Sequence, residues 1–354
     1  MNIGCFMDNY SNFLNCRIKS VYELFLFSGV NISPYLLSLL SQNSNAYFSV
    51  VKYKGIEIPV FSSLHPCAEK NILNKLNISY TAKSIDKIEE ISDLIEEDKA
   101  VLISYDADAL SRRVNKHNFG ITSTTVLWQY EKPFFISTRK EEMDFLKYQE
   151  DILELSMDIE TQPVAAKKEI IFLSNYHPDS TILSEEVLAT AIISNLKETK
   201  ERAISRESCI LNSYNCIEGT DAFLKMRDAL KILNQIIVLQ SSKEVSRRMF
   251  ILSVTIIMKI MEKNGFGFDS FYNCFWFGYQ KFSQMINHKI ENIENDLALV
   301  IIKKWKELYQ LLLEVRNYAS DNKSIDHFFK LLLNLFIDIE NTEQRLFSNI
   351  SIVK

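Results

Sequence analysis

Apolar residues recur at helical spacing just after Cys16 and define the first clear element of the chain. Segment 17–28 carries apolar side chains on nearly all of its faces, which predicts a helix that is almost entirely buried. Gly29 is typical of a helix end, and Ser33 is typical of the cap of a second helix over 34–40. Two helices joined by a short turn are therefore expected after Cys16.

The pattern then shortens to runs that are typical of strands, with two more helices among them. Three of these strands follow one another with short connections, which predicts an antiparallel meander and an α+β fold. The strand-like segments are 47–53, 58–61, 100–105, 117–128 and 134–136, with 168–173 as a further candidate; the helix-like segments are 69–76 and 84–96, the second capped by Ser84.

From Ser184 onward the pattern is helical throughout. The expected helices cover about 184–201, 219–233, 242–263, 268–285, 290–319 and 324–347. Before them, regular patterning weakens and charge rises between Arg139 and Asp179, which favours a boundary there. The sequence thus predicts an α+β domain over 1–145, a linker with one candidate strand over 146–183, and an all-α helical domain over 184–354.

Composition limits the class of protein. The chain has 354 residues, of which 47% are hydrophobic and 24% charged, the profile of a globular protein with a sizeable core. A formal net charge of −5 offers no basic face for nucleic acid. The most apolar run, 249–261, is too short to cross a bilayer, so no membrane partner is expected.

The six cysteines show no spacing typical of a metal site. There is no CxxC pair and no Cys/His cluster with zinc-ligand spacing, so we expect neither a metal nor a cofactor. Segment 1–10 lacks the cationic and apolar regions of a signal peptide. These features together favour reduced thiols and a cytoplasmic protein.

Cys16 is the candidate nucleophile, because a thiol at the start of a helix lies near the positive end of the helix dipole, where its pKa can be lowered. The thiolate needs a base, and His117 begins a β-branched strand later in the chain. A helix-borne cysteine followed by a strand-borne histidine is the order of papain-like enzymes. The alternative is that Cys16 is a small buried residue with no chemistry, which is the commoner role of such a cysteine.

The predicted meander brings further polar residues toward this histidine. Asp106 and His117 flank the same loop, and the chain returns from the Pro133 turn with Ser137. In a papain-like triad this last position holds the Asp or Asn that orients the imidazole. Asp106 and Ser137 are therefore the candidates for orienting His117.

Four segments carry a resemblance to a known family, and further helical segments extend it over most of the chain. The N-terminal ones are NCRIKSVYELFLFSGVNISPYLLSLL, YFSVVKY, KAVLISYDADAL and KHNFGITSTTVLWQYEKPFFIST, and the C-terminal ones include IEGTDAFLKM and MEKNGFGFDSFYNCFWFGYQKF. The chain resembles the family named after the butirosin biosynthesis acyltransferase, which has a papain-like domain and an accompanying helical domain. The positions that match the family pattern are Cys16, Gly29, Ser33, Asp106, Leu110, His117, Trp305, Glu340 and Glu343.

The resemblance implies acyl transfer without a cofactor. An acyl group held as a thioester, on an acyl carrier protein, would pass to Cys16 and then to a small amine, giving the amide of a specialised metabolite such as an antibiotic. The main-chain N–H of Cys16, with Asn15 or Asn12, would bind the oxyanion. A hydrolase that uses the same pair, and a degenerate binding protein of the same fold, are the alternatives.

Two departures from the family pattern bear on catalysis. The family closes the second meander strand with an Asp, where this chain has Ser137, and it often places a His before the cysteine, where this chain has Asn15. Loss of an orienting acid lowers the rate of such enzymes by orders of magnitude. Separately, Phe268, Tyr272 and Trp276 could line an acyl pocket, although their helical spacing equally fits plain core or the subunit interface of a homodimer.

Overall fold

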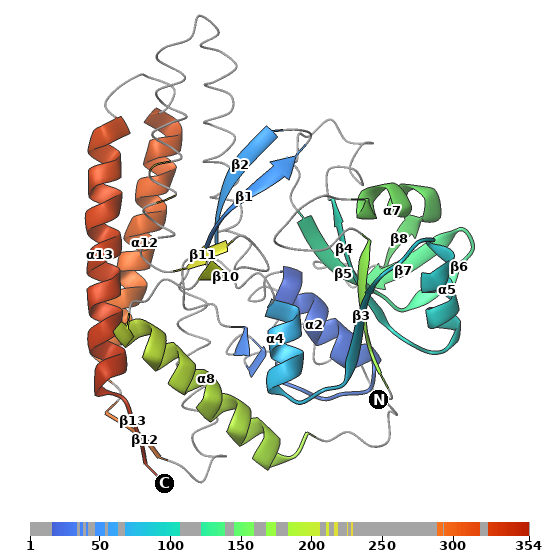
Figure 1. Cartoon of the computed structure of the whole chain (residues 1–354), viewed down its shortest axis with the longest axis horizontal. Coiled ribbons are helices and arrows are strands. Elements are labelled where there is room, and N and C mark those ends of the chain that lie inside the picture. Colours follow the sequence, from blue (N-terminus) through green and yellow to red (C-terminus); the bar gives the residue numbers. More distant parts are fainter. Residues whose placement is uncertain are drawn as a thin grey trace, which may run out of the picture. The chain divides into compact units, whose positions relative to one another are not determined.

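The computed structural model divides into two compact units, which are described separately (Figure 1). Unit 1 comprises Met1–Ser41 and Cys67–Ala191, and unit 2 comprises Gln42–Pro66 and Ile192–Lys354. The residues that the structure describes are 16–33, 36–37, 40–41, 47–53, 56–62, 68–106, 122–138, 145–158, 168–174, 183–205, 210–211, 216–218, 225, 228, 289–292, 294–318 and 325–353.

A four-stranded antiparallel sheet forms the centre of unit 1. Its strand order is β3 (Tyr80–Ser84), β9 (Glu169–Leu173), β4 (Val101–Asp106) and β5 (Thr122–Leu127). The β4–β5 pairing runs from Val101 opposite Leu127 to Asp106 opposite Thr122. This confirms the antiparallel pairing that the sequence predicts for the first two strands of the meander.

A second antiparallel sheet continues the first. Its order is β6 (Gln129–Glu131), β7 (Phe134–Thr138) and β8 (Phe145–Gln149). Trp128 joins β5 to β6, and its main-chain N–H donates to the Ile136 carbonyl at 3.2 Å. Strand β7 therefore returns beside the β5–β6 segment, which confirms the third strand of the meander and the turn at Pro133.

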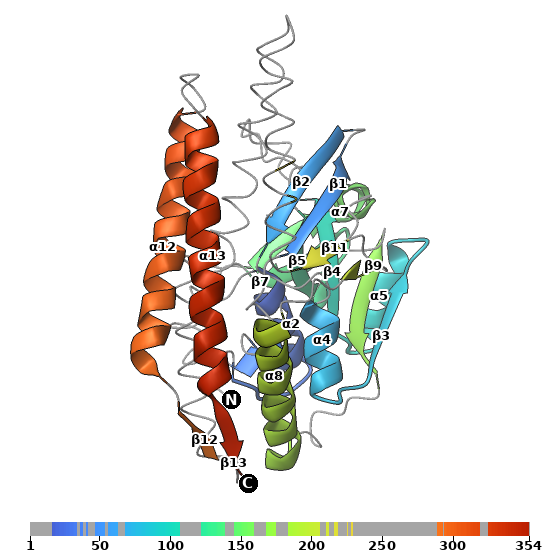
Figure 2. The ribbon, with the colours of Figure 1, turned by 60° about the vertical axis from the view of Figure 1, so that its left-hand side comes forward.

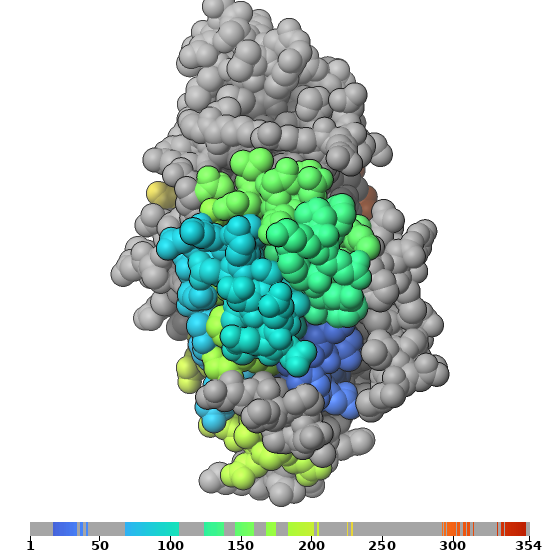
Figure 3. Space-filling view, turned by 90° about the vertical axis from the view of Figure 1, so that its right-hand side faces the viewer, coloured from blue at the N-terminus to red at the C-terminus, as the bar shows by residue number. Residues whose placement is uncertain are grey.

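Helices cover both faces of these strands (Figure 1). Side chains alternate along β4, so Val101 and Ile103 belong to a buried apolar cluster with Ile91 of α5 (Glu89–Glu96) and Leu153 of α7 (Glu150–Met157). Helices α2 (Cys16–Phe27) and α4 (Ala68–Lys75) pack together, with α2 on β5 and β4. Figure 3 shows the face of unit 1 on which residues of α5 and α7 lie at the surface.

Helix α2 has the character that its apolar pattern predicts. Ile18, Val21 and Leu24 each expose 2% or less of their surface. Gly29 ends the helix with a positive φ of 78°, a conformation that suits glycine, and the Val30 N–H donates to the Phe25 carbonyl at 2.8 Å. Of the second predicted helix, positions 36, 37 and 40 are described; they are helical and their leucines are buried.

The helix predicted over 84–96 begins later than expected, at Glu89. Ser84 is the last residue of β3, paired with Glu169, so its predicted role as a helix cap is wrong. The Glu90 carboxylate instead reaches back and accepts the main-chain N–H of Asp86 at 2.9 Å. A carboxylate in the first turn satisfies free N–H groups there as a serine cap would.

The segment predicted as a linker, 146–183, contains regular structure. Most of β8, all of α7 and the predicted strand β9 lie within it, and β9 pairs with both β3 and β4. Leu153 and Met157 of α7 are almost fully buried. Much of this segment is therefore part of the core of unit 1.

Unit 2 combines a small sheet with long helices (Figure 2). Strands β1 (Tyr47–Tyr53) and β2 (Ile56–Ser62) form the predicted hairpin, and the sheet order is β10 (Ile210–Leu211), β11 (Cys216–Glu218), β1, β2. Strand β12 (Lys289–Glu291) pairs with β13 (Ser351–Val353). The prediction that 184–354 is all-helical is therefore wrong for these short strands. Cys216–Glu218 pairs with the edge of β1, and this pairing partner cannot be predicted from the local sequence.

Three of the predicted C-terminal helices are confirmed: α8 (Glu185–Ser205), α12 (Asn295–Tyr318) and α13 (Ile325–Asn349). Helix α8 crosses the division between the units. The helices predicted over 242–263 and 268–285 lie outside the described residues, as does all of 219–233 except the helical positions 225 and 228. In the described part of the chain, every helix is too short or too polar to span a membrane.

Candidate functional site

Cys16 is the first residue of α2, as the sequence predicts, and its side chain lies outside the described part. The first turn, Cys-Arg-Ile-Lys, contains two cations and no acid. Cations at this end of a helix oppose its dipole, whereas acids would favour it. Cations near a cysteine lower the pKa of its thiol, but both cations of this turn are paired with carboxylates, Arg17 with Glu69 and Lys19 with Glu23.

Helix α2 lies along β5 and runs in the same direction. The Ser20 hydroxyl donates to Oγ1 of Thr124 at 3.1 Å, and the ring of Phe27 stacks on Trp128 with centroids 5.1 Å apart. Positions four and seven residues apart share one face of a helix, so position 16 is on the face that carries Ser20 and Phe27. The helix position of Cys16 is therefore on the side of α2 that meets β5.

The first residue of α2 is level with the start of β5. Cys16 precedes Ser20 by four residues, about 6 Å along a helix, and Thr122 precedes Thr124 by two residues, about 7 Å along a strand. Thr122 is paired with Asp106, which ends β4. The helix thus begins near the end of the hairpin at which the chain leaves β4 and re-enters β5.

The segment that joins these two strands, 107–121, contains His117 and lies outside the described residues. Both of its ends, at Asp106 and Thr122, are fixed by the strand pairing. The two residues that flank this segment, Asp106 and Thr122, are therefore at the same end of the sheet as the first turn of α2. The distance from Cys16 to His117 remains a prediction.

Ser137 lies deeper in the sheet than this end. It is fully buried, and its hydroxyl oxygen is 2.5 Å from that of Thr125, three residues into β5 from Thr122. Tyr148 belongs to the same buried group: desolvation raises the pKa of its phenol, an effect that a hydrogen bond with Thr125 partly offsets. A contact of Ser137 with His117 stays a prediction, while its bond to Thr125 is observed.

Two ion pairs surround the first half of α2, and the sequence pattern alone did not reveal either. Nε and Nη2 of Arg17 donate to the two carboxylate oxygens of Glu69, in the first turn of α4, and both residues are buried. Lys19 is 3.2 Å from Glu23, whose side chain is only 2% exposed. The one sequence feature that could have indicated these ion pairs is the presence of charged residues in an otherwise apolar helix.

The remaining predicted site residues lie outside the described part of the chain. They are Asn12, Asn15, Phe268, Tyr272 and Trp276. Asp106 is described as the last residue of β4, without its side-chain surroundings. Among the described residues, no group of three or more His, Cys, Asp or Glu could hold a metal ion.

In unit 2, a groove of about 790 Å³ runs between α12 and α13. Its walls mix aliphatic, amide and charged side chains, among them Leu311, Glu314, Leu331 and Asn334. Next to it Lys304 donates to Asp338 at 2.9 Å and to Thr342 at 3.1 Å. Further along α13, desolvation raises the pKa of the half-buried Glu343 to about 8.

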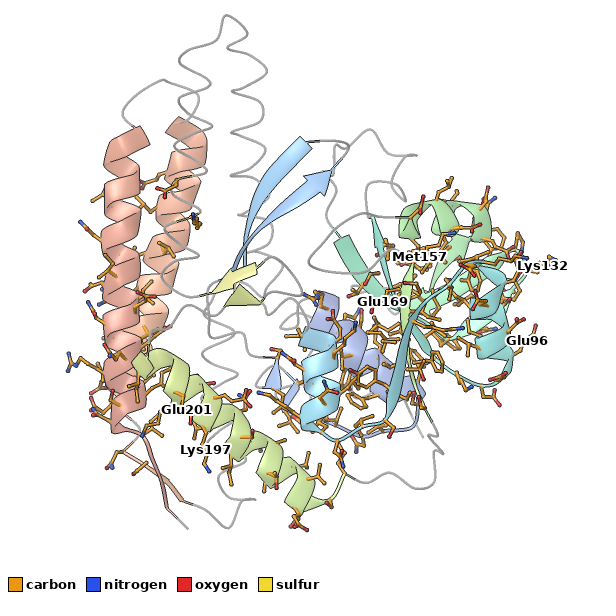
Figure 4. The ribbon with its side chains drawn as sticks, in the orientation of Figure 1. Glu96, Lys132, Met157, Glu169, Lys197 and Glu201 are labelled. Carbon is orange, nitrogen blue, oxygen red and sulfur yellow. The ribbon has the colours of Figure 1, made fainter. Side chains whose placement is uncertain are left out.

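Figure 4 shows how the described side chains are distributed, with Met157 and Glu169 in unit 1 and Lys197 and Glu201 on α8.

Neither the models of known protein families nor the curated protein sequences give a match to this chain.

Proposed function

We propose that this chain is a cysteine-dependent acyltransferase with a papain-like arrangement, in which Cys16 is the nucleophile and His117 the base. The observation that carries the proposal is the register of α2 on β5, in which the helix that begins at Cys16 starts level with the Asp106–Thr122 pair. The resemblance of the segments around Cys16, Asp106 and His117 to the butirosin acyltransferase family supports the same pair.

The reaction proceeds in two balanced halves. His117 takes the proton of the Cys16 thiol, and the thiolate attacks the carbonyl carbon of an acyl thioester. The carbon–sulfur bond to the donor breaks, and the donor thiol leaves with the proton held by His117. The product of this half is a thioester on Cys16.

In the second half, an amine attacks the acyl group on Cys16. His117 accepts a proton from the attacking nitrogen and returns it to the Cys16 sulfur as that bond breaks. The products are an amide and the free enzyme. The main-chain N–H of Cys16, with Asn15 or Asn12, is proposed to hold the oxyanion of both tetrahedral intermediates. The proposed donor is an acyl carrier protein, and the proposed acceptor is a small amine.

The imidazolium that forms in each half needs an orienting group. Ser137 is already hydrogen-bonded to Thr125 in the sheet, whereas Asp106 ends β4 where the segment with His117 departs. We therefore assign the orienting role to Asp106 in preference to Ser137.

The experiment supplies the full chain with an acyl thioester of N-acetylcysteamine and a primary amine, and follows both the released thiol and the amide. Acyl transfer predicts equal amounts of the two products, lost in Cys16→Ala and retained in Cys216→Ala, which removes a thiol from β11 of unit 2. Thiol release with free acid and no amide would instead indicate a hydrolase. Binding without any turnover would indicate a degenerate binding protein.

A further inference from the structure

Strand β3 forms one edge of the four-stranded sheet of unit 1 (Figure 2). It pairs with β9 along its whole length, from Tyr80 opposite Leu173 to Ser84 opposite Glu169, and no described strand lies on its other side. None of its five side chains is buried, and the last three are exposed. An open edge of this kind is a template on which a further strand can pair.

The main-chain groups of β3 divide between its two sides. In an antiparallel ladder, alternate residues direct both their N–H and their C=O toward the same neighbouring strand. The Ile85 N–H donates to the Lys168 carbonyl at 3.1 Å, so the odd-numbered positions of this segment bond to β9. The N–H and C=O groups of Tyr80, Ala82 and Ser84 therefore point to the open edge.

These three positions are symmetric about Ala82, which makes the edge complementary to a second copy of itself. When two β3 strands run antiparallel with Ala82 opposite Ala82 of the partner subunit, Tyr80 lies opposite Ser84 of the partner subunit, and the same pair recurs on the other side of the axis. Each facing pair exchanges two main-chain hydrogen bonds, about six in all. The contact is a two-fold one, in which both copies use the same surface.

The charge of β3 favours this register over its neighbour. Lys83 is the one charged residue of the strand, and in the two-fold register it lies opposite Thr81 of the partner subunit. A shift of two residues would set Lys83 directly opposite Lys83 of the partner subunit, which is unfavourable. A lysine often protects an edge strand from pairing. Here its ammonium donates to Glu90 of the same chain at 2.7 Å, so its charge is offset within the chain.

We infer that β3 is the interface through which two copies of this chain associate. The pairing joins the four-stranded sheets of two copies of unit 1 into one continuous antiparallel sheet. This inference is independent of the proposed function. Main-chain bonds over five residues make a small interface, so we expect a reversible dimer with a dissociation constant in the micromolar range.

The first test is sedimentation velocity of the full chain at concentrations from below to above the micromolar range. The wild type should pass from monomer to dimer as the concentration rises. Ala82→Pro removes the central N–H, which β9 does not use, and proline is tolerated in edge strands. It should weaken association about tenfold or more, because two of the bonds across the axis are lost. Ala82→Ser keeps the N–H and should associate as the wild type does.

A second test, with Ala82→Cys, addresses the register. Facing residues of a hydrogen-bonded pair have Cα atoms about 5.5 Å apart, which a disulfide can span. Mild oxidation should link position 82 of the two copies, as identified by peptide mass spectrometry. The matched control is Ser84→Cys, on the same side of the strand. The two copies of position 84 would be more than about 10 Å apart, beyond the reach of a disulfide.

Three results would overturn the inference. A wild type that stays monomeric at every concentration would contradict it and leave the open edge to an extended segment of another protein. A dimer that Ala82→Pro does not weaken would place the contact elsewhere. So would linkage in Ala82→Cys that is no faster than in Ser84→Cys. If the proline variant does not fold, Ala82→Asp replaces it; two carboxylates then face each other on the axis and should weaken association most at low salt.

Discussion

The hydroxyl oxygens of Ser137 and Thr125 lie 2.5 Å apart inside the sheet of unit 1, with Ser137 fully buried. The resemblance drawn from the sequence implies an acid at the position where this chain has Ser137. A buried carboxylate there would need a cation or several hydrogen-bond donors, whereas the partner of Ser137 is the single neutral hydroxyl of Thr125. The bond therefore indicates a structural role for Ser137 in this chain.

Substitutions of Ser137 distinguish a structural role of this residue from a catalytic one. Ser137→Ala leaves the buried Thr125 hydroxyl with one partner fewer and should lower the free energy of unfolding by about 1–2 kcal/mol, measured by urea denaturation. Ser137→Asp would place a carboxylate in a fully buried position and should cost more than about 3 kcal/mol. Acyl transfer by the alanine variant should stay within a few-fold of the wild type.

Asp106→Asn changes the residue to which the orienting role is assigned, in contrast to the substitutions of Ser137. It should slow acylation of Cys16 by about 10²-fold or more and leave the unfolding midpoint near that of the wild type, since the substitution keeps the volume of the side chain. Faster acylation in Ser137→Asp, with the fold intact, would contradict the assignment of the orienting role to Asp106.

Helix α7 offers a test of the fold within a single element. Leu153 is fully buried in the core cluster, while Leu155, two residues later, is 68% exposed. Leu153→Ala should destabilise the protein by about 2–5 kcal/mol, and Leu155→Ala by less than about 0.5 kcal/mol. Similar losses of unfolding free energy in the two variants would contradict the packing of α7 against the sheet.

Glu343 gives the stability a predictable dependence on pH. Desolvation raises the pKa of this carboxyl from 4.5 to about 8 in the folded protein. Between these values the folded state holds a proton that the unfolded chain has released, so the free energy of unfolding falls as the pH rises from about 4.5 to about 8. Glu343→Gln should flatten this decline and increase stability near pH 8 by at least about 1 kcal/mol.

The control for this prediction is Glu307→Gln, on the exposed face of α12. The free energy of unfolding, measured by urea denaturation near pH 5 and near pH 8, should change between these two values by the same amount in this variant as in the wild type. If the free energy of unfolding depends on pH equally in Glu343→Gln and the wild type, the proton on Glu343 does not contribute to the pH dependence of stability.

The sequence predicted the elements that have a clear side-chain pattern. Such an element has one apolar and one polar side, or is apolar throughout. Helix α2 and strand β4 are apolar on nearly all sides, and β5 was recognisable by its β-branched residues; residues 101–103 of β4 and 124–127 of β5 are all buried. Strand β3 was missed because Tyr80–Ser84 has no buried residue to mark it as a strand. Strands β10 and β11 have two and three residues, too few for any period to show.

The candidate site was predictable only as a set of residue types. Cys16 at a helix start could be found from the local pattern, but the partners that fix its helix could not. Glu69 is 52 residues from Arg17, and Thr124 is 104 residues from Ser20. Such pairs depend on how distant elements pack, and local spacing contains no information on that.

The central claim is that Cys16 is a nucleophile activated by His117. The most direct measurement incubates the full chain with an acyl thioester and maps the acyl group by peptide mass spectrometry over all six cysteines. We predict an adduct on Cys16 that forms far faster than on the other five, and that is lost in His117→Ala while the protein stays folded. Equal labelling of all six thiols, or an undiminished Cys16 adduct in His117→Ala, would contradict the claim.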